Sequence, residues 1–271
     1  AMFARRVGRC LSALVTLTAS ISAATAEQRT WTDNTGKFSI EAEFVAISDG
    51  KLVLKAATGK TVRVPLDRLG QTDRRHAEAL EGIAQGAALR ANPIAADIKA
   101  AGAWVTVDRL RPGAPIVKVR FHSIHRLGAE AALQRLAQLP SLEELDFLSG
   151  SVTDAALSHL SKLKSLRKLD LSHTGITKAG LAHLAELTEL RSLDLAGVAV
   201  TDVGLAHLEQ LTNLESLTLG GKQITNDGLA HLSRMTKLKL LVLGGTKITD
   251  AGLVHLKQLA NLREVRLYGP K

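Results

Sequence analysis

Residues 166–189 read LRKLDLSHTGITKAGLAHLAELTE, and this stretch decides the fold because it recurs at a fixed interval of 24 residues. Other full copies begin at Leu142, Leu190, Leu214 and Leu238, and a shortened copy begins at Leu262. Five full copies without an insertion indicate one supersecondary unit stacked on itself, which is the sequence signature of a solenoid. Such a stack has one long concave face, and this architecture typically uses that face to bind other macromolecules.

The repeat combines two hydrophobic periods. Leu169 and Leu171 alternate with polar residues, which predicts a strand, whereas Leu181, Leu184 and Leu187 are spaced by three, which predicts one buried face of a helix. A threonine opens the helix in every copy and is expected to act as its N-cap: Thr153, Thr177, Thr201, Thr225 and Thr249. Asp154, Asp202 and Asp250 follow it and favour the positive end of the helix dipole.

The resulting pattern, LxxLxLxxTxITDxGLxxLxxL, resembles the leucine-rich repeat in the variant common in exported bacterial proteins. It is also similar to the repeats of the F-box leucine-rich family, but no F-box helices precede it here. The resemblance implies an α/β solenoid, with parallel strands on the concave face and helices on the convex face. The usual asparagine of the turn is replaced by Gly150, Thr174, Val198, Lys222 and Thr246, so a looser turn is expected.

Residues flanking the five copies are expected to extend and cap the stack. Residues 116–141 resemble a divergent first rung, with Phe121 at the position of Phe147. Upstream, Asn92-Pro93 predicts a helix start with proline at the first helical position. That helix and a strand at residues 104–107 would seal the N-terminal end of the stack. The opposite end, at residues 267–271, is predicted to be open and to invite self-association.

Residues 29–80 have a different texture, with short alternating runs at residues 38–44, 52–54 and 62–64. Tight turns at Asp49-Gly50 and Thr58-Gly59 separate these three predicted strands, which indicates a small curled sheet or barrel. Thr72 is expected to cap a helix that runs to about Leu80.

This segment resembles the first homology domain of the fungal endocytic adaptor Sla. The matching residues are Trp31, Asp33, Gly36, Phe38, Ala42, Phe44, Gly50, Lys55, Gly59, Val64, Leu69 and Asp73. The resemblance implies a small SH3-like all-β barrel that grips a short peptide, with an Asn-Pro-Phe core in the fungal case. Ubiquitin binding and cytoskeletal-protein binding are also associated with that family. Lys55 and Arg63 are our candidates for a peptide groove.

The N-terminus has the residue pattern of a secretory signal peptide. Arg5, Arg6 and Arg9 precede a short apolar run, and residues 24–26 form an A-x-A cleavage site. An uncleaved N-terminal anchor is the alternative, although the run is too short to span a bilayer and no later stretch qualifies. Cleavage would remove Cys10, the sole cysteine, and lower the formal net charge from +9 to +6. We therefore expect a protein exported to the periplasm, cell envelope or exterior, without disulfides and without a stable membrane span.

The chemistry of the repeats points to binding. No catalytic motif is present, and the scattered Lys and Arg residues are weak evidence for nucleic acid, so no catalytic residue, cofactor or nucleic acid partner is expected. One histidine column recurs at the same helical position: His159, His183, His207, His231 and His255. Helices of adjacent rungs pack about 8–10 Å apart, so we interpret this column as a helix-surface feature without a metal. A pH-sensitive convex face is the alternative.

On the predicted concave face, Asp146, Asp170 and Asp194 occupy one column on successive strands. Like charges so placed oppose folding, and a basic partner or a divalent cation would neutralise them; a solvated acidic stripe eased by Lys168 and Arg120 is the alternative. A small-residue, half-apolar patch follows: Ser192, Ala196, Ser216, Thr218, Gly220, Leu240, Val242 and Gly244. Arg266 and Tyr268 at its edge are its only large anchors of the kind that dominate interfaces.

The sequence therefore predicts four parts. These are a signal peptide at 1–26, the SH3-like module at 27–82, a helical connector and cap at 83–115, and the leucine-rich solenoid at 116–271. We expect a non-enzymatic adaptor that binds a protein on the concave face and a peptide on the SH3-like module. The alternative is a self-associating structural protein of the cell envelope, a homo-oligomer joined through its C-terminal end.

Overall fold

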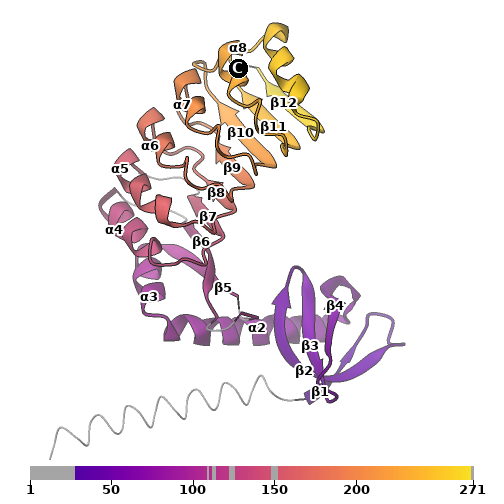
Figure 1. Ribbon diagram of the computed structural model, residues 1–271. Helices are drawn as coiled ribbons and strands as arrows, with labels where there is room; N and C mark the ends of the chain where they lie inside the picture. The colour runs from indigo at the N-terminus through magenta and orange to yellow at the C-terminus, as the bar shows by residue number, and fades with distance from the viewer. Residues whose placement is uncertain (1–27, 109, 112–113, 122–125, 148–151, 270–271) are drawn as a thin grey trace, which may run out of the picture. The chain divides into compact units, whose positions relative to one another are not determined.

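The computed structural model describes residues 28–108, 110–111, 114–121, 126–147 and 152–269. The predicted signal peptide lies outside these residues. The chain divides into two compact units, Ala1–Asn92 with Asp108–Ala114, and Pro93–Val107 with Pro115–Lys271 (Figure 1). The predicted boundary after residue 82 falls inside a helix of the first unit, and the predicted domain limits stay a prediction.

The first unit is an antiparallel sheet followed by a long helix. Its elements are β1 (Gln28–Thr32), β2 (Ser39–Ser48), β3 (Lys51–Ala56), β4 (Thr61–Pro65), the 3-10 helix η1 (Leu66–Arg68) and α2 (Gln71–Ala91). The four strands pair in the order β1-β2-β3-β4. A bridge between Asp33 and Leu69 brings the chain after β1 against the chain after β4, so the sheet curls back on itself.

The core of this unit explains several of the residues that carry the family resemblance. Trp31, Phe44 and Leu54 are buried together, with Ala77 of α2 packed in the same cluster. The indole Nε1 of Trp31 donates to the carbonyl oxygen of Ala42 at 3.0 Å, which satisfies the polar end of a buried ring. The Asp49-Gly50 turn has positive φ at both residues, 51° and 70°, as a tight two-residue hairpin requires.

Two expectations for the first unit are wrong. Strand β1 was not predicted, because Trp31 is its only large apolar residue and no alternation is visible in QRTWT. The helix begins one residue before Thr72, with Gly70 at the N-cap and no side-chain cap, and it continues eleven residues beyond Leu80 to Ala91. Four alanines in residues 81–91 favour this extension despite two glycines.

The second unit is the predicted solenoid. It begins with α3 (Pro93–Ala100), β5 (Ala103–Val107), β6 (Ile116–Phe121), α4 (Arg126–Leu136) and β7 (Glu144–Phe147). Pro93 is the first residue of α3, as predicted. Strand β5 pairs antiparallel with β6 and caps the stack, whereas β6 and the following strands are all parallel. The Phe121 and Phe147 rings stack at 5.2 Å and β6 pairs in parallel with β7, so β6 and α4 form the first rung that was predicted.

The remaining rungs follow in chain order. Their strands are β8 (Lys168–Asp170), β9 (Ser192–Leu195), β10 (Ser216–Gly220), β11 (Leu240–Gly244) and β12 (Glu264–Tyr268). Their helical segments are α5 (Asp154–Leu157), η2 (Ser158–Lys162), α6 (Lys178–Ala182), α7 (Asp202–Ala206), α8 (Asn226–Ala230) and η3 (Asp250–Gln258). The strands form one eight-stranded sheet on the inner side of the unit, and the helices lie on its outer side (Figure 1). The repeat leucines between the two layers are buried.

Helix starts in the solenoid are linked from rung to rung. Thr153, Thr177, Thr201 and Thr225 accept a backbone N–H as N-caps, as predicted, but Thr249 makes no such bond. The carboxylate of Asp154 accepts from the backbone N–H and hydroxyl of Thr177 at 2.7 and 2.6 Å. Asp202 does the same for Thr225, and Asn226 bonds Thr249 through its amide. We call this series the threonine ladder.

Candidate functional site

Strand pairing sets the outward side chains of the solenoid sheet in columns, which together we call the strand face. The acid column contains Arg120, Asp146, Asp170, Asp194, Thr218, Val242 and Arg266. The second column contains Lys118, Glu144, Lys168, Ser192, Ser216, Leu240 and Glu264. The predicted concave-face residues thus lie in two adjacent columns, and Tyr268 lies in a third beside Gly244. Whether they bind a partner stays a prediction.

The three aspartates of the acid column have different surroundings. Asp146 is nearly buried, and its Oδ2 accepts from Arg120 Nε at 2.8 Å. Asp170 and Asp194 each accept a backbone N–H two residues on, from Ser172 and Ala196, both at 2.9 Å. Neither forms an ion pair with any residue that the structure describes. The column therefore contains one carboxylate with an ion-pair partner and two that have none among the described residues.

Burial raises the pKa of Asp194 above its ordinary value, and the charge of Asp170 adds to the rise. The backbone bond from Ala196, a hydrogen bond with the Thr218 side chain and the nearby His173 oppose it. The charged form of Asp194 is therefore less favourable in the folded protein than that of a fully exposed aspartate. Lys168 was expected to ease the stripe, but it is exposed and forms no ion pair within the described part of the chain. A cation brought by a partner would relieve this carboxylate pair.

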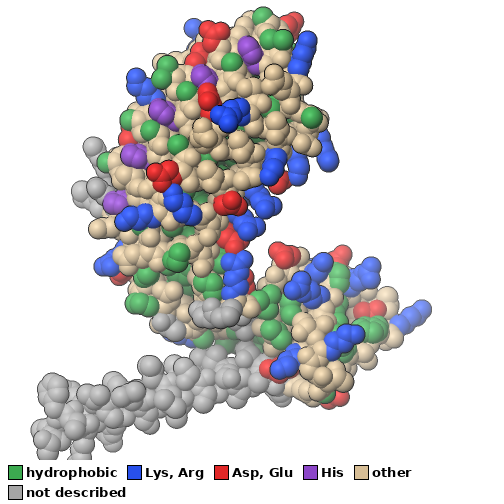
Figure 2. All heavy atoms as spheres, viewed as in Figure 1, with side chains coloured by type: hydrophobic (Ala, Val, Ile, Leu, Met, Phe, Trp, Pro, Cys, Tyr) green, Lys and Arg blue, Asp and Glu red, His purple; other side chains and the backbone are tan. Residues whose placement is uncertain are grey.

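Other acids of the two columns are already neutralised. Glu144 pairs with Lys118 at 2.5 Å, and Glu264 pairs with Arg266 at 2.7 Å. Ser192, Ser216 and Leu240 are half-buried and continue the second column as a small, partly apolar surface. Figure 2 shows the basic side chains along the strand side of this unit.

One large anchor of the strand face was missed from the sequence. Trp104 on β5 pairs with Arg120 and so continues the acid column at its N-terminal end, with 65% of its surface exposed. The sequence assigned Trp104 only to a capping strand, because the antiparallel register of β5 with β6 is not encoded in the repeat. Trp and Arg are the residue types that most often dominate binding energy.

A shallow groove lies where strands β9 to β11 end and their turns begin. It is lined by residues 197–200, 220–223 and 244, and its lining is mainly apolar. We call it the glycine groove, because Gly220 and Gly244 contribute to it from the ends of neighbouring strands. It overlaps the predicted small-residue patch at these two glycines.

In the first unit, the two candidate peptide contacts share one face of the sheet. Lys55 pairs with Thr61 and Arg63 pairs with Val53, so the two exposed cations lie diagonally across β3 and β4. The buried Asp73 is structural instead: it accepts from Arg29 and from the backbone N–H of Thr32, both at 2.6 Å.

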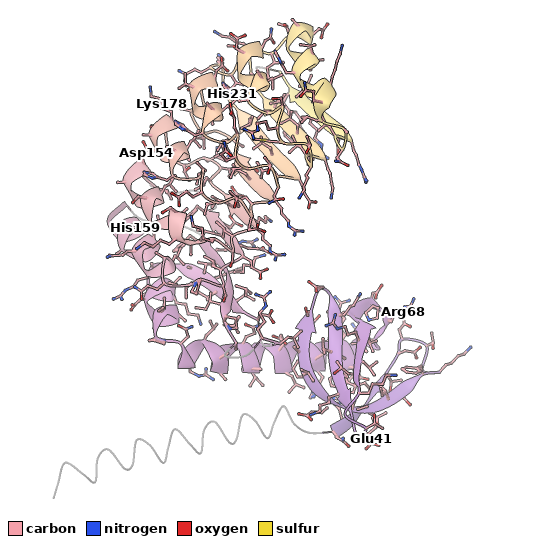
Figure 3. All side chains as sticks on the ribbon, in the orientation of Figure 1. Glu41, Arg68, Asp154, His159, Lys178 and His231 are labelled. Atoms are coloured by element: carbon pink, nitrogen blue, oxygen red, sulfur yellow. The ribbon has the colours of Figure 1, made fainter. Side chains whose placement is uncertain are left out.

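The histidine column lies along the helix side of the second unit (Figures 2 and 3). His231 lies 2.5 Å from the carboxylate of Glu209, and this is an isolated pair rather than part of a chelating set. Among the described residues, no group of three or more His, Cys, Asp or Glu side chains is placed to hold a metal ion. No helix within the described ranges is long and apolar enough to cross a membrane.

Comparison with known families agrees with both sequence resemblances. The chain matches SLA1 homology domain 1 (SHD1) over residues 20–85, and the leucine-rich repeat over residues 162–185 and 234–257. It therefore contains an SHD1 domain followed by leucine-rich repeats. The SHD1 match begins inside the predicted signal peptide. Both modules are typically non-catalytic and indicate a role in protein interaction.

Curated relatives match only the first module. The actin cytoskeleton-regulatory complex protein sla1 of Sclerotinia sclerotiorum is 40% identical over 58 residues, which cover 21% of this chain and 5% of that protein. Its namesake in Schizosaccharomyces pombe is 41% identical over 54 residues, which cover 20% of this chain and 4% of that protein. The chain thus spans a small fraction of the length of these relatives.

Solved structures similar to this chain include two internalins of Listeria monocytogenes. The internalin inlF is 20% identical with a TM-score of 0.43, and the match covers 56% of this chain and 48% of that one. Internalin C2 is 20% identical with a TM-score of 0.36, and the match covers 65% and 93% of the two chains. At these values the likeness carries no functional information.

Proposed function

We propose that this protein is an exported, non-enzymatic adaptor that binds a protein partner on the strand face of its solenoid. The observation that carries the proposal is the neighbouring pair Asp170 and Asp194, neither of which forms an ion pair with a described residue. The other acids of the two columns, Asp146, Glu144 and Glu264, each form an ion pair with a Lys or Arg of the chain. A basic group of a partner would therefore be attracted most strongly to Asp170 and Asp194. Trp104 and Arg120 would extend the contact at one end of the column.

Affinity capture from an envelope fraction of the native organism tests this proposal, with the full mature chain as bait. The Asp170→Lys, Asp194→Lys double variant should lose a specific partner that the wild type retains. Asp227→Lys is the matched control, since Asp227 is an exposed acid on helix α8 away from the strand face. A partner captured equally by all three baits would show that the strand face is not the binding surface.

A short peptide is the proposed ligand of the SHD1 module. The exposed cations Lys55 and Arg63 share a face there, and the resemblance to the fungal adaptor supplies the probe, a peptide with an Asn-Pro-Phe core. Titration of the full chain, followed by amide chemical shifts, should move signals of β3 and β4. The Lys55→Glu, Arg63→Glu double variant should abolish those shifts, and shifts elsewhere would place the peptide on another surface.

Self-association is a second candidate function, favoured by strand β12. Val265 and Leu267 occupy positions whose counterparts Leu241 and Leu243 are buried, yet they are 38% and 58% exposed. Within the described residues β12 pairs only with β11, so a second copy could pair along its other side. Sedimentation of the full chain should then show concentration-dependent mass that Leu267→Lys reduces. A constant monomer mass for both would exclude this candidate.

A further inference from the structure

The glycine groove contains two glycines with ordinary backbone angles, and the fold has open space for a side chain at one of them, Gly244. Gly221 and Gly245 have φ of 126° and 65°, which other residues rarely adopt, so the turns need them. Gly244 has no such φ, and a Cβ added to it would meet only the carbonyl oxygen of Leu219 at 3.9 Å. At Gly220, which is buried, an added Cβ would meet two backbone atoms at 3.4 Å, at the tight limit of ordinary contact.

A glycine within a strand weakens that strand and commonly marks a place where another backbone approaches closely. The repeat-equivalent residues before the groove are Ser172 and Ala196, and the equivalent after it is Tyr268, which is 58% exposed. This third column is therefore lowest at β10 and β11 and is bounded by an aromatic side chain. Its depth is set by the missing side chains of Gly220 and Gly244.

The charged side chains at the groove are positive and lie on its turn side. Lys222 is exposed and belongs to the lining, and Lys247 lies one rung further at the position equivalent to Gln223. Neither lysine forms an ion pair with a described residue. The turn side of the groove thus offers cations, and no carboxylate lines it.

We propose that the glycine groove is a docking site for an extended segment of a partner protein, whose backbone lies over Gly220 and Gly244 and whose Asp or Glu side chain pairs with Lys222. This proposal rests on the proposed function, because it assumes a protein partner on the solenoid. An extended segment fits since it brings a backbone close to the glycines and still presents side chains to one side.

The test uses a displayed library of random linear nonapeptides, selected on the full mature chain. Enriched peptides should carry an acidic residue, and as synthetic peptides they should bind Gly244→Val at least tenfold more weakly than wild type. Gly175→Ala is the matched control, because an added Cβ there meets only the Val152 carbonyl oxygen at 3.8 Å and Gly175 lies outside the groove. Its affinity should equal that of wild type.

A charge exchange keeps the test independent of any effect of Gly244→Val on folding. Lys222→Glu should weaken the same peptides at least tenfold, and a peptide with Lys in place of its acid should recover the loss. Equal binding by wild type and both variants overturns the groove, as does binding that free acetate displaces fully at millimolar concentration. If only the Asp170→Lys, Asp194→Lys double variant loses the peptides, the groove is not their site, but the proposed function stands. If no peptide is enriched, the groove proposal alone fails.

Discussion

At the scale of single residues, the acid column shows how one residue type serves two purposes. Asp146 pairs with Arg120 and is part of the packed sheet, whereas Asp194 is half-buried beside Asp170 and has no Lys or Arg partner among the described residues. A carboxylate whose pKa burial has raised above 3.8 takes up a proton more readily in the folded protein than in the unfolded chain. The ionised form of Asp194 therefore reduces the stability of the free protein.

The raised pKa of Asp194 sets the direction in which the stability of the protein changes with pH. Just above pH 3.8 the folded state binds more protons than the unfolded chain, so Asp194's contribution to stability falls as pH rises through its raised pKa and stays low at neutral pH. Asp194→Asn should raise the free energy of unfolding at pH 7 by about 0.2–1 kcal/mol. The gain should vanish below pH 3.8 in urea titrations. A loss of stability at pH 7 would contradict it.

Asp73 gives the opposite prediction, because its carboxylate is buried and satisfied. Asp73→Ala should destabilise the first unit by about 1–3 kcal/mol, since the backbone N–H of Thr32 loses its acceptor. Hydrogen exchange at the Thr32 amide should accelerate, and exchange in the solenoid strands should not change. Glu78→Ala is the control, because it removes an exposed acid from the same helix. Unchanged exchange at Thr32 would refute the structural role of Asp73.

At the scale of elements, the threonine ladder joins successive helices and has one gap. Asp154, Asp202 and Asn226 each bond the threonine of the next rung, but Lys178 stands at the equivalent position before Thr201 and cannot accept a hydrogen bond. Figure 3 shows Asp154 and Lys178 on neighbouring helical segments. Lys178 also places a positive charge at the positive end of α6.

Filling the gap should stabilise the solenoid. Lys178→Asp should raise the free energy of unfolding by about 1 kcal/mol, because it supplies the missing acceptor to Thr201 and removes an unfavourable charge. Lys178→Ala, which only removes the charge, should recover less than half of that gain. Equal gains in chemical denaturation would show that the ladder contributes nothing.

The ladder also explains glycines inside the short helices. An added Cβ at Gly228 would collide with the Asp202 carboxylate. At Gly204 its one tight contact would be the flexible end of Leu181 at 3.0 Å, and its other neighbours lie at 3.6 Å. Gly228→Ala should therefore cost about 1–3 kcal/mol. Gly204→Ala should be neutral or mildly stabilising, since alanine favours helix. Thermal melts of the two variants give the comparison, and similar melting temperatures would contradict it.

The 24-residue repeat allowed the elements of the solenoid rungs to be predicted from the sequence. The strands, threonine caps and buried leucines of the rungs follow from residues 24 apart, and the register that aligns Asp146, Asp170 and Asp194 follows from the same spacing. Contacts between non-equivalent segments could not be predicted this way. The exposure of Trp104 depends on an antiparallel pairing, and the extension of α2 depends on propensities that glycine obscures.

At the scale of the whole molecule, the solenoid should behave as a set of nearly interchangeable rungs. Strand register repeats every 24 residues, and the threonine ladder follows the same spacing except at Lys178. Removal of residues 190–213 therefore joins Glu189 to Leu214 and sets β8 directly beside β10. Each rung contacts mainly its neighbours, which makes the stability of such a stack roughly a sum of rung and interface contributions.

The shortened chain should therefore fold cooperatively, with a lower free energy of unfolding and a smaller m-value because less surface is exposed on unfolding. Its new interface would place Lys178 beside Thr225, so the gap in the ladder should persist, and Lys178→Asp should stabilise the shortened chain as it does the full one. Removal of residues 202–213 alone is the control, since it joins a strand to a strand without the intervening helix. If both deletions unfold the solenoid to the same extent, the rungs are not the unit of stability, and the two columns of the strand face would depend on the whole stack.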